Sequence, residues 1–305
     1  MTSDQADISI LIPTRNNEND LIDCLKSIDS LDYIPEKIKI IIWDNNSRPE
    51  SKKTVKDYLT QMAGRCSLQV EFIENNDNYG VYTSRHELCK RVTSDNRFIL
   101  SIDDDVILPP NLLNELINNF HSDSSVGIIG PRTVFDNEPD QTAHGAGFIN
   151  WWLGRYTDVD AKTIMECDYV IGCCMLIKKS VIEEIGGFDL DYYTSHGEVD
   201  FCIKAKQKGY KTLYCPEVVV RHRVDRGGTK TPERRYYLYR NKIFLIRKNA
   251  PVPQKWVSLF LYSLFWLPKN ILYSIIRNAG FDYDEVKIMI KAMKDGWLNK
   301  TGKRF

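Results

Sequence analysis

Short apolar runs alternate with amphipathic stretches over the first hundred residues of the chain. Four apolar runs have the length of buried strands: residues 8–13, 37–43, 68–75 and 97–103. Three intervening stretches carry apolar residues at helical spacing: residues 17–31, 51–63 and 79–92. Strands that are apolar almost throughout and alternate with helices are typical of a parallel sheet covered on both faces. The pattern therefore predicts an α/β fold.

The second half of the chain is less regular but predicts the same class of fold. It contains, in order, a strand and turn at 126–135, a glycine- and aromatic-rich stretch at 144–156, a strand leading into a helix at 167–189, a helix at 197–210 and a strand at 212–223. Gly186 and Gly187 are placed to end the helix of the third segment. We therefore predict a mostly parallel sheet covered by helices.

Polar residues follow each of the four strands predicted in the first half. These polar segments are 13–17, 44–47, 75–80 and 103–105. Ligands of open α/β sheets bind beyond the carboxyl ends of the strands. Because the four strand ends are expected to share one rim of the sheet, the segments together predict a ligand-binding crevice.

Three adjacent carboxylates, Asp103, Asp104 and Asp105, come directly after the apolar run 98–100. Carboxylates at the end of a buried strand repel one another, and this repulsion is poorly screened. A cation, a helix N-terminus or plain solvent can compensate it. The three residues by themselves leave all of these explanations open.

The composition is that of a folded protein with unevenly placed charge. Of the 305 residues, 43% are apolar and 27% are charged, which excludes an intrinsically disordered chain. The formal net charge is zero, but residues 221–305 carry 19 Lys and Arg against 6 Asp and Glu, and the remainder carries 22 against 35. We therefore expect the basic tail to meet an anionic partner.

The eight cysteines and the first residues favour a cytoplasmic protein. No two cysteines form a C-x-x-C pair, and most lie in apolar or helical contexts, as reduced core thiols do. The opening sequence MTSDQADIS is polar and acidic and lacks the features of a signal peptide. A reducing, cytoplasmic setting is expected.

The basic tail contains two stretches suited to a membrane surface. Residues 256–276 are apolar and aromatic, but Pro268 and Lys269 interrupt them, which makes a poor spanning helix. Residues 284–305 interleave apolar and basic residues in the pattern of an interfacial helix. We expect peripheral attachment to the inner face of the cell membrane, where anionic lipids attract the basic excess. The alternative is that these stretches form a helical cap packed on the body or an interface between copies of the chain. A homo-oligomer is therefore not excluded.

Seven segments, in order along the chain, resemble the family-2 glycosyltransferases, which are inverting enzymes with the GT-A nucleotide-sugar fold. They are SILIPTRNN, WDNNS, NDNYGVYTSRHELCK, SIDDDVILPPN, GCCMLIKKSVIEEIGGFD, GEVDFCIKAKQKGY and VVVRHR. A later stretch, ERRYYLYRNKIFLIRK at 233–248, is similar to the tail of rhamnosyltransferase-type members.

The resemblance implies a GT-A, Rossmann-like catalytic domain at residues 1–225. Its nucleotide-binding part would be at about 1–108 and its acceptor-binding part at about 109–225. The composition shifts most sharply near 225–232. Residues 226–305 would then be a basic, amphipathic helical extension.

By the resemblance, the three aspartates are the D-x-D motif that holds a divalent cation at the diphosphate of the donor. Asp105 is the expected metal ligand, Asp103 faces the metal or the ribose, and His222 completes the metal site. Mn²⁺ or Mg²⁺ suits such ligands and offsets the charge of the diphosphate. Asp104 is expected to point to the other side of the extended segment, within the nucleotide-sugar site. The alternatives are a solvated acidic turn and a histidine that bonds the backbone.

Glu198 stands where the family has its catalytic base. The family usually has Glu-Asp followed by any residue and Asp, whereas this chain has Gly197-Glu198-Val199-Asp200. A base at this position would take the proton from the acceptor hydroxyl as its oxygen attacks the anomeric carbon. The alternative is a plain acidic residue at a helix N-terminus.

The resemblance places the nucleotide-sugar site in the loops after the first strands. Its residues, besides Asp103 and Asp104, are Pro13, Thr14, Arg15, Asp44, Asn78, Gly80 and Arg85. Asp44 would accept a hydrogen bond from the pyrimidine N3–H, which UDP and dTDP share. Arg85 could instead be an ordinary cation on the surface of its helix.

Trp151 and Trp152 lie where the acceptor side of the family begins. Aromatic faces commonly stack on sugars, so both are candidates for contacts with the acceptor. The alternative is that one of the pair belongs to the core.

The expected function is transfer of a sugar from a UDP- or dTDP-activated donor to a hydroxyl of a glycan or lipid-linked glycan, with no nucleic-acid partner. The alternative is a catalytically silent subunit that binds sugar or lipid in an assembly complex, which the Gly197-Glu198 departure leaves open. A sugar nucleotidyltransferase is a weaker alternative, because such enzymes usually carry a glycine-rich loop where this chain has PTRNNEND.

Overall fold

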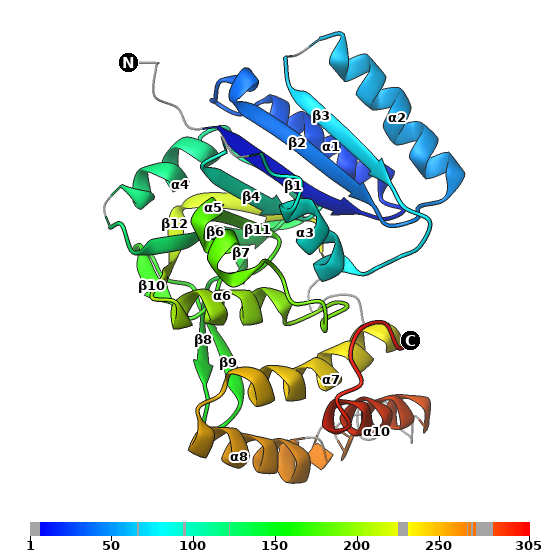
Figure 1. Cartoon of the computed structure of the whole chain (residues 1–305), viewed down its shortest axis with the longest axis vertical. Helices are drawn as coiled ribbons and strands as arrows, with labels where there is room; N and C mark the ends of the chain where they lie inside the picture. Colours follow the sequence, from blue (N-terminus) through cyan, green and yellow to red (C-terminus); the bar gives the residue numbers. More distant parts are fainter. Residues whose placement is uncertain are drawn as a thin grey trace.

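One sheet runs through both halves of the molecule, and helices cover its faces (Figure 1). The computed structural model describes residues 7–305 except 66, 94–95, 122, 225–230, 267, 270 and 273–282. The strand order is β10 (Met165–Cys167), β12 (Lys211–His222), β6 (Val126–Phe135), β11 (Cys174–Lys178), β4 (Phe98–Ile102), β1 (Ile8–Thr14), β2 (Ile38–Asp44) and β3 (Gln69–Glu74). Off this path, β5 (Val106–Ile107) pairs with β12, and β7 (Glu138–His144) pairs with β6.

The first half of the sheet is parallel, as the sequence predicted. β3, β2, β1 and β4 run in the same direction, with Ile8 of β1 opposite Ile38 of β2 and Phe98 of β4. The helical elements of this half are α1 (Glu18–Asp29), η1 (Pro35–Lys37), α2 (Pro49–Ala63) and α3 (Val81–Cys89). The carboxyl ends of these strands therefore meet at one edge.

Neighbouring side chains along a strand point to opposite faces of the sheet, and each face has its own core. Ile10 of β1 packs in the cluster that contains Leu21 and Leu25 of α1. Its neighbour Leu11 packs in the cluster that contains Leu88 of α3. Because both faces are covered, the strands are apolar at nearly every position, and the sheet is a rigid support for the loops at its edge.

An antiparallel strand joins the two halves of the sheet. β11 lies between β4 and β6 and is antiparallel to both, whereas β6 and β12 are parallel. α5 (Lys179–Ile185) and α6 (Gly197–Gln207) occupy predicted helical segments. α4 (Leu112–Phe120) is a helix that the sequence analysis did not predict, and it buries its apolar side in the core of the first half.

The glycine- and aromatic-rich stretch forms a separate hairpin. β8 (Ala146–Asn150) and β9 (Arg155–Val159) make a two-stranded antiparallel sheet that extends from the body toward the C-terminal helices (Figure 1). Tyr169 packs directly on the backbone of Gly147, where a Cβ would lie only 2.4 Å from the tyrosine ring. The absence of a side chain at Gly147 therefore sets how the hairpin sits on the body.

The C-terminal part of the chain is helical, as predicted. It consists of α7 (Pro232–Asn249), α8 (Val252–Leu261), the π-helical turn η2 (Tyr262–Trp266) and α10 (Tyr283–Trp297). α10 lies along α7 at one end of the molecule (Figure 1). The expected domain boundary at 225/226 lies outside the described residues.

The apolar stretch 256–276 forms short elements. α8 ends at Leu261 and η2 at Trp266, while residues 267, 270 and 273–276 lie outside the described residues. Within the part of the chain that the structure describes, no helix has the length and apolar character needed to cross a membrane.

The interfacial face predicted for residues 284–305 is turned onto protein. Met289 is buried, Ile288 packs against the cluster of Tyr236 and Tyr237 in α7, and Met293 packs against a cluster formed by α7, α8 and η2. The expectation of a lipid-facing α10 therefore does not hold for Ile288, Met289 and Met293, whereas Trp297 of the same pattern is exposed. An amphipathic pattern fits burial against a protein surface as well as burial in lipid.

We predict that Gly147→Ala lowers the free energy of unfolding by about 1–3 kcal/mol, because the added methyl group overpacks the contact with Tyr169. Gly64→Ala is the matched control, since its Cβ would meet nothing closer than 3.7 Å and its φ of −83° suits any residue. Urea unfolding of both variants measures the difference. Equal stability of the two variants would contradict the assigned packing.

Candidate active site

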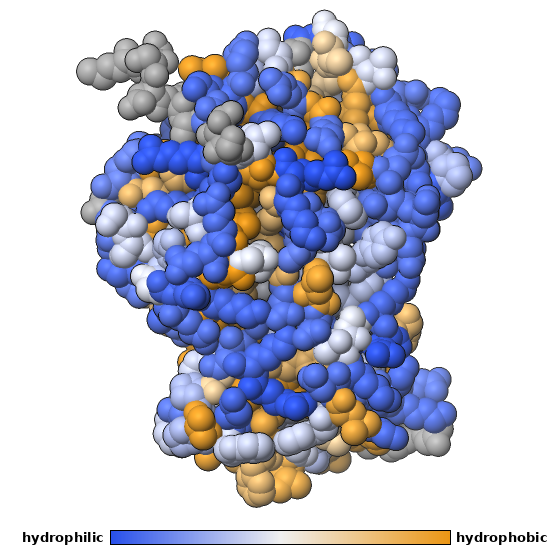
Figure 2. All heavy atoms as spheres, viewed as in Figure 1, coloured by the Kyte–Doolittle hydropathy of each residue, from blue (hydrophilic) through white to orange (hydrophobic). Residues whose placement is uncertain are grey.

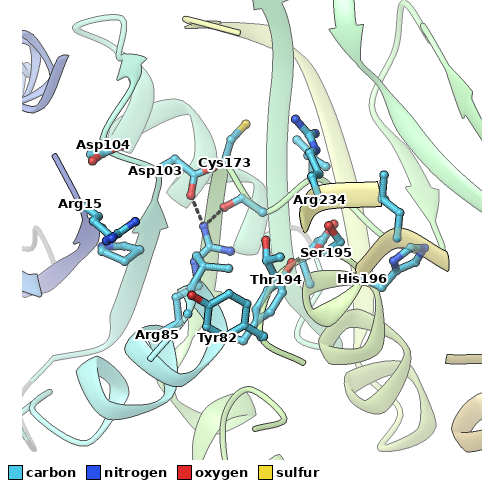
Figure 3. Close-up of a pocket in the computed structure, with 18 of the residues that line it drawn as sticks. Arg15, Tyr82, Arg85, Asp103, Asp104, Cys173, Thr194, Ser195, His196 and Arg234 are labelled. Carbon is cyan, nitrogen blue, oxygen red and sulfur yellow. Dashed lines mark hydrogen bonds and ion pairs between the residues drawn. The ribbon is translucent and has the colours of Figure 1, made fainter. Parts of the chain in front are cut away.

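A cleft of about 880 Å³ lies between the carboxyl edge of the parallel strands and the start of α6. Figure 3 shows Arg15 and Asp104 on one side, Thr194, Ser195 and His196 on the other, and Arg85 between them. Most of the predicted site residues line it: Pro13, Thr14, Arg15, Asn78, Gly80, Arg85, Asp103, Asp104, Glu198 and His222. The fold thus brings together segments that are far apart in the sequence.

Arg85 connects the first aspartate of the triplet to the opposite wall. Its Nη2 donates to Asp103 Oδ1 and to the carbonyl oxygen of Gly172, both at 2.6 Å (Figure 3). Arg85 is only 2% exposed, so it is not a surface cation of α3. Burial raises the pKa of Asp103, the Arg85 guanidinium opposes this shift, and the charge of Asp105 adds to it.

Two glycines allow the walls of the cleft to approach each other. A Cβ at Gly172 would lie 2.6 Å from Arg85 Nη1. Gly80 has a φ of +83°, and a Cβ there would lie 2.4 Å from the carbonyl oxygen of Tyr193. Side chains are therefore excluded at both positions by the protein itself.

Asp104 points away from its two neighbours and fastens the loop after β1. Thr14 Oγ1 donates to Asp104 Oδ2 at 2.6 Å, and Asn17 Nδ2 donates to Asp104 Oδ1 at 3.1 Å. Burial and the nearby charge of Asp105 raise the pKa of Asp104 to about 7, against the effect of these two hydrogen bonds. The predicted alternation of side-chain direction along the triplet is thus observed.

Asp103, Asp105 and His222 form a cluster that could hold a cation. Each offers one ligand atom, and these atoms all lie within 4.8 Å of one another. β12 pairs with β5 in the register His222 to Val106, and this places the imidazole next to Asp105. Asp105 Oδ1 lies 3.0 Å from His222 Nε2, although Asp105 does not line the cleft.

Two atoms of this cluster are buried without a hydrogen bond of good geometry among the described residues, namely Asp105 Oδ1 and His222 Nδ1. Buried polar atoms that lack a hydrogen bond are costly, and two carboxylates with one imidazole suit Mn²⁺ or Mg²⁺. Burial disfavours the imidazolium, but Cys173 and Asp105 outweigh it and raise the pKa of His222 to about 11. A cation bound to the imidazole would replace that proton.

Glu198 is the second residue of α6 and lines the cleft in a buried position. The phenol of Tyr82 donates a hydrogen bond to Glu198 Oε2. Burial, with the charge of Glu198, raises the pKa of Tyr82 well above its usual value, so Tyr82 stays protonated and remains a donor. The carboxylate is therefore held in one orientation.

The turn before Glu198 is held by the C-terminal helix α7. Ser195 and His196 have positive φ angles of 63° and 71°, which is unfavourable for residues with side chains. Asn241 of α7 is fully buried, and its Nδ2 donates to the carbonyl oxygens of Thr194 at 2.6 Å and Ser195 at 3.0 Å. α7 thus fixes the turn from which α6 and Glu198 start.

The first turns of α7 form part of the cleft wall. Thr231, Glu233, Arg234 and Leu238 line the cleft, and Figure 3 shows Arg234 beside the Thr194–His196 turn. His196 is half-buried and lies near Lys242; desolvation and the charge of Lys242 lower its pKa to about 3, so the ring is neutral. The helical extension is therefore part of the site and not only an appendage.

Asp44 does not line the cleft. It is buried, its Oδ2 accepts the backbone N–H of Ser47 at 3.0 Å, and the same oxygen lies 3.5 Å from Lys52 Nζ. Its neighbour Asn45 does line the cleft. One carboxylate oxygen of Asp44, Oδ2, therefore holds the loop after β2 in place.

Trp151 and Trp152 also lie outside the cleft. They line a separate cavity of about 430 Å³ on the hairpin, together with Gln254 of α8. The hydroxyl of Ser258 donates to the carbonyl oxygen of Trp151. Instead, Tyr156, Tyr169 and Tyr193 are the aromatic residues that line the cleft on the side of α6.

Sequence reasoning missed the residues that hold Glu198 in place. Tyr82 lies three residues before Arg85 on α3, so both share one face of that helix, and this spacing is a usable signal. Asn241 is followed by the apolar run Ile243–Ile246, all buried. However, α7 also contains seven charged residues, so a polar residue in it gives no separate signal, and the partners of Asn241 cannot be read from the sequence.

Comparison with known proteins identifies one family over most of the chain. The model of glycosyl transferase family 2 matches residues 9–186, and that of glycosyl transferase family group 2 matches residues 98–279. The low-salt glycan biosynthesis hexosyltransferase Agl10 of Haloferax volcanii is 23% identical over 247 residues, which are 77% of this chain and 74% of that protein. The O-antigen chain rhamnosyltransferase RfbN of Salmonella typhimurium is 21% identical over 307 residues, 90% of this chain and 88% of that protein.

Solved structures share the fold at low sequence identity. The mannosyltransferase PcManGT from Pyrobaculum calidifontis, in complex with GDP-Man and Mn²⁺, superposes with a TM-score of 0.63 at 15% identity, covering 98% of this chain and 89% of that chain. TarS of S. aureus, in complex with UDP-GlcNAc, gives a TM-score of 0.63 at 14% identity over 96% of this chain and 81% of that one. These similarities show the GT-A fold.

We predict that Asp105→Asn weakens Mn²⁺ binding by about 100-fold or more. Changing a residue that only supports a metal ligand already lowers metal affinity about 10- to 100-fold, and Asp105 would be a ligand itself. Asp140→Asn, at an exposed position away from the cluster, is the matched control and should bind like the unchanged protein. Titration of Mn²⁺ followed by electron paramagnetic resonance measures both. Unchanged affinity in Asp105→Asn would exclude this cluster as the metal site.

Proposed function

The chain belongs to the family-2 glycosyltransferases, and we propose that it moves a sugar, with inversion, from a UDP- or dTDP-activated donor to a hydroxyl of a glycan or lipid-linked glycan. Membership of the family establishes glycosyl transfer. The donor nucleotide, the metal and the base are the proposed parts. The observation that carries them is one cleft that is bordered by the Asp103, Asp105 and His222 cluster and also contains Glu198.

A divalent cation, Mn²⁺ or Mg²⁺, held by Asp103, Asp105 and His222 would supply the Lewis acid for the leaving diphosphate. Arg85 orients Asp103 by its hydrogen bond, so that the carboxylate need not reorganise when the donor enters. The same arginine is held by the Gly172 carbonyl, which fixes the position of its charge.

The loops after the parallel strands would bind the nucleotide sugar. We assign this role to Pro13, Thr14, Arg15, Asn78, Gly80 and Asp104, which line the cleft. Ser47 and Lys52 both engage Oδ2 of Asp44, and we propose that Oδ1 accepts the pyrimidine N3–H. Uridine and thymidine nucleotides offer the same N3–H, so both donor classes fit.

Glu198 would be the catalytic base. Its carboxylate takes the proton of the acceptor hydroxyl while that oxygen bonds to the anomeric carbon and the bond from this carbon to the diphosphate oxygen breaks. This single displacement inverts the anomeric configuration. Tyr82, which donates to Glu198 Oε2, orients the base.

The acceptor would enter on the aromatic side of the cleft. Tyr156 and Tyr169 line this side, and aromatic rings there offer stacking surfaces for sugars. Trp151 and Trp152 lie in the separate cavity on the hairpin, and we retain them as contacts for a more distant unit of the acceptor. The match to RfbN over 90% of this chain supports a rhamnosyltransferase-type subgroup.

We place the protein in the cytoplasm, at the inner face of the cell membrane, where lipid-linked glycans would be presented. The basic excess of residues 221–305 supports this location, because the inner leaflet is anionic.

We predict that UDP or dTDP raises the melting temperature in the presence of Mn²⁺ by several degrees. A ligand at a hundred times its Kd stabilises the folded state by about 2.7 kcal/mol. A thermal-shift panel of nucleoside diphosphates with and without Mn²⁺ measures this. GDP and ADP serve as controls, and a panel without any metal-dependent shift would favour a catalytically silent subunit.

We predict that Glu198→Gln lowers kcat by about 100- to 10,000-fold, because it removes the general base, while donor binding is retained. Tyr82→Phe should lower kcat about tenfold by freeing the carboxylate, also without loss of donor binding. Initial rates of transfer and nucleotide titrations separate the two effects. Loss of nucleotide binding in step with kcat would assign Glu198 a structural role instead.

A further inference from the structure

One side of α8 carries a stripe of large, exposed apolar side chains. Val252, Trp256 and Phe260 repeat every four residues, and the last two are 63% and 57% exposed. Phe265 of η2 is exposed as well, and its ring lies 6.4 Å from that of Phe260. Figure 2 shows apolar side chains gathered at this end of the molecule, over α8. A continuous apolar surface of this kind marks an interaction site.

The tip of the hairpin between β8 and β9 extends this surface. Trp152 and Leu153 are exposed at the tip, and Trp152 lines the small cavity together with Gln254 of α8. Six residues therefore make up what we name the α8 face: Trp152, Leu153, Val252, Trp256, Phe260 and Phe265.

The part of the sequence that contains α8 and η2 has cations but no carboxylates. Residues 234–281 contain nine Lys and Arg but no Asp or Glu. Lys255 precedes Trp256 in α8. Near Trp266 of η2, the Arg155 Cζ lies 4.3 Å and the Lys269 Nζ 5.3 Å from the ring centroid. We name these three cations the basic rim.

We propose that the α8 face inserts into the headgroup region of an anionic phospholipid bilayer, with the basic rim on the lipid phosphates. Tryptophan is suited to this region because its ring is apolar and its N–H is polar. A second copy of the chain is disfavoured as the occupant, because two basic rims would face each other and repel. Anionic lipid supplies both the apolar phase and the opposite charge.

This surface replaces the one expected from the sequence. The apolar face of α10 is taken up by α7, whereas the α8 face is left exposed within the described residues. The membrane contact is therefore made by a short helix and a hairpin tip on one end of the molecule.

The hairpin connects the α8 face to the cleft. At its tip, the Trp151 carbonyl accepts a hydrogen bond from the Ser258 hydroxyl of α8, and along β9, Tyr156 and Asp158 line the cleft. A glycan anchored in the bilayer would reach the cleft along this hairpin. This last step rests on the proposed glycosyl transfer, whereas bilayer binding does not.

The test is flotation of the full chain with vesicles of phosphatidylcholine alone or mixed with phosphatidylglycerol. The unchanged protein should float with the anionic vesicles, and less so at high salt, which screens exposed charges. Trp256→Ser and Phe260→Ser should each weaken binding about tenfold, since each removes a large apolar side chain from the interface. Lys255→Gln with Lys269→Gln should remove the preference for phosphatidylglycerol.

Ile290→Ser on α10 is the matched control, because Ile290 is also half exposed. It should leave flotation unchanged, and all variants should keep the metal-dependent nucleotide shift, which separates this inference from the proposed function. Failure of the unchanged protein to float with either vesicle would overturn the proposal. So would equal loss in Ile290→Ser, or light scattering that finds a dimer which Trp256→Ser dissociates.

Discussion

The mutual repulsion of three adjacent carboxylates at the end of a buried strand is the constraint around which the site is arranged. Each of them is compensated by a different part of the chain. Asp103 receives Arg85 from α3, Asp104 receives hydrogen bonds from the loop after β1, and Asp105 lies against His222 at the end of β12. Because those partners come from three elements, meeting the charge requirement also fixes how these elements are placed relative to one another.

The C-terminal helices complete this arrangement from outside the sheet. Asn241 satisfies two carbonyl groups of a turn with unfavourable φ angles, and the adjacent Arg240 donates to the carbonyl oxygens of Gly302 at 2.7 Å and Asp191 at 3.4 Å. Arg240 is fully buried and lies with its Cζ 4.7 Å from the centroid of the Tyr237 ring. Two neighbouring residues of α7 thereby connect the tail to the segment that precedes Glu198.

The parallel half of the fold could be read from the sequence because burial on both faces leaves an unmistakable pattern. The strand at 8–13 is apolar at nearly every position, and both of its faces are covered. Residues of the site could be found where a strand end or a motif marks them, as with Asp103 and Glu198. The helical spacing from Arg85 indicates Tyr82, but the partners of Tyr82 and Asn241 lie in distant segments, which no local pattern encodes. The same limit explains α10, whose apolar face could have met lipid or protein.

The continuity of the sheet restricts how the molecule can move. β11 is hydrogen-bonded to β4 on one side and to β6 on the other, so the two halves of the sheet share backbone ladders. A hinge between the two halves of the sheet would have to break these hydrogen bonds. Motions that open and close the cleft must therefore come from loops and helix ends outside the sheet. The shared backbone ladders exclude a rotation of two rigid halves about a flexible linker.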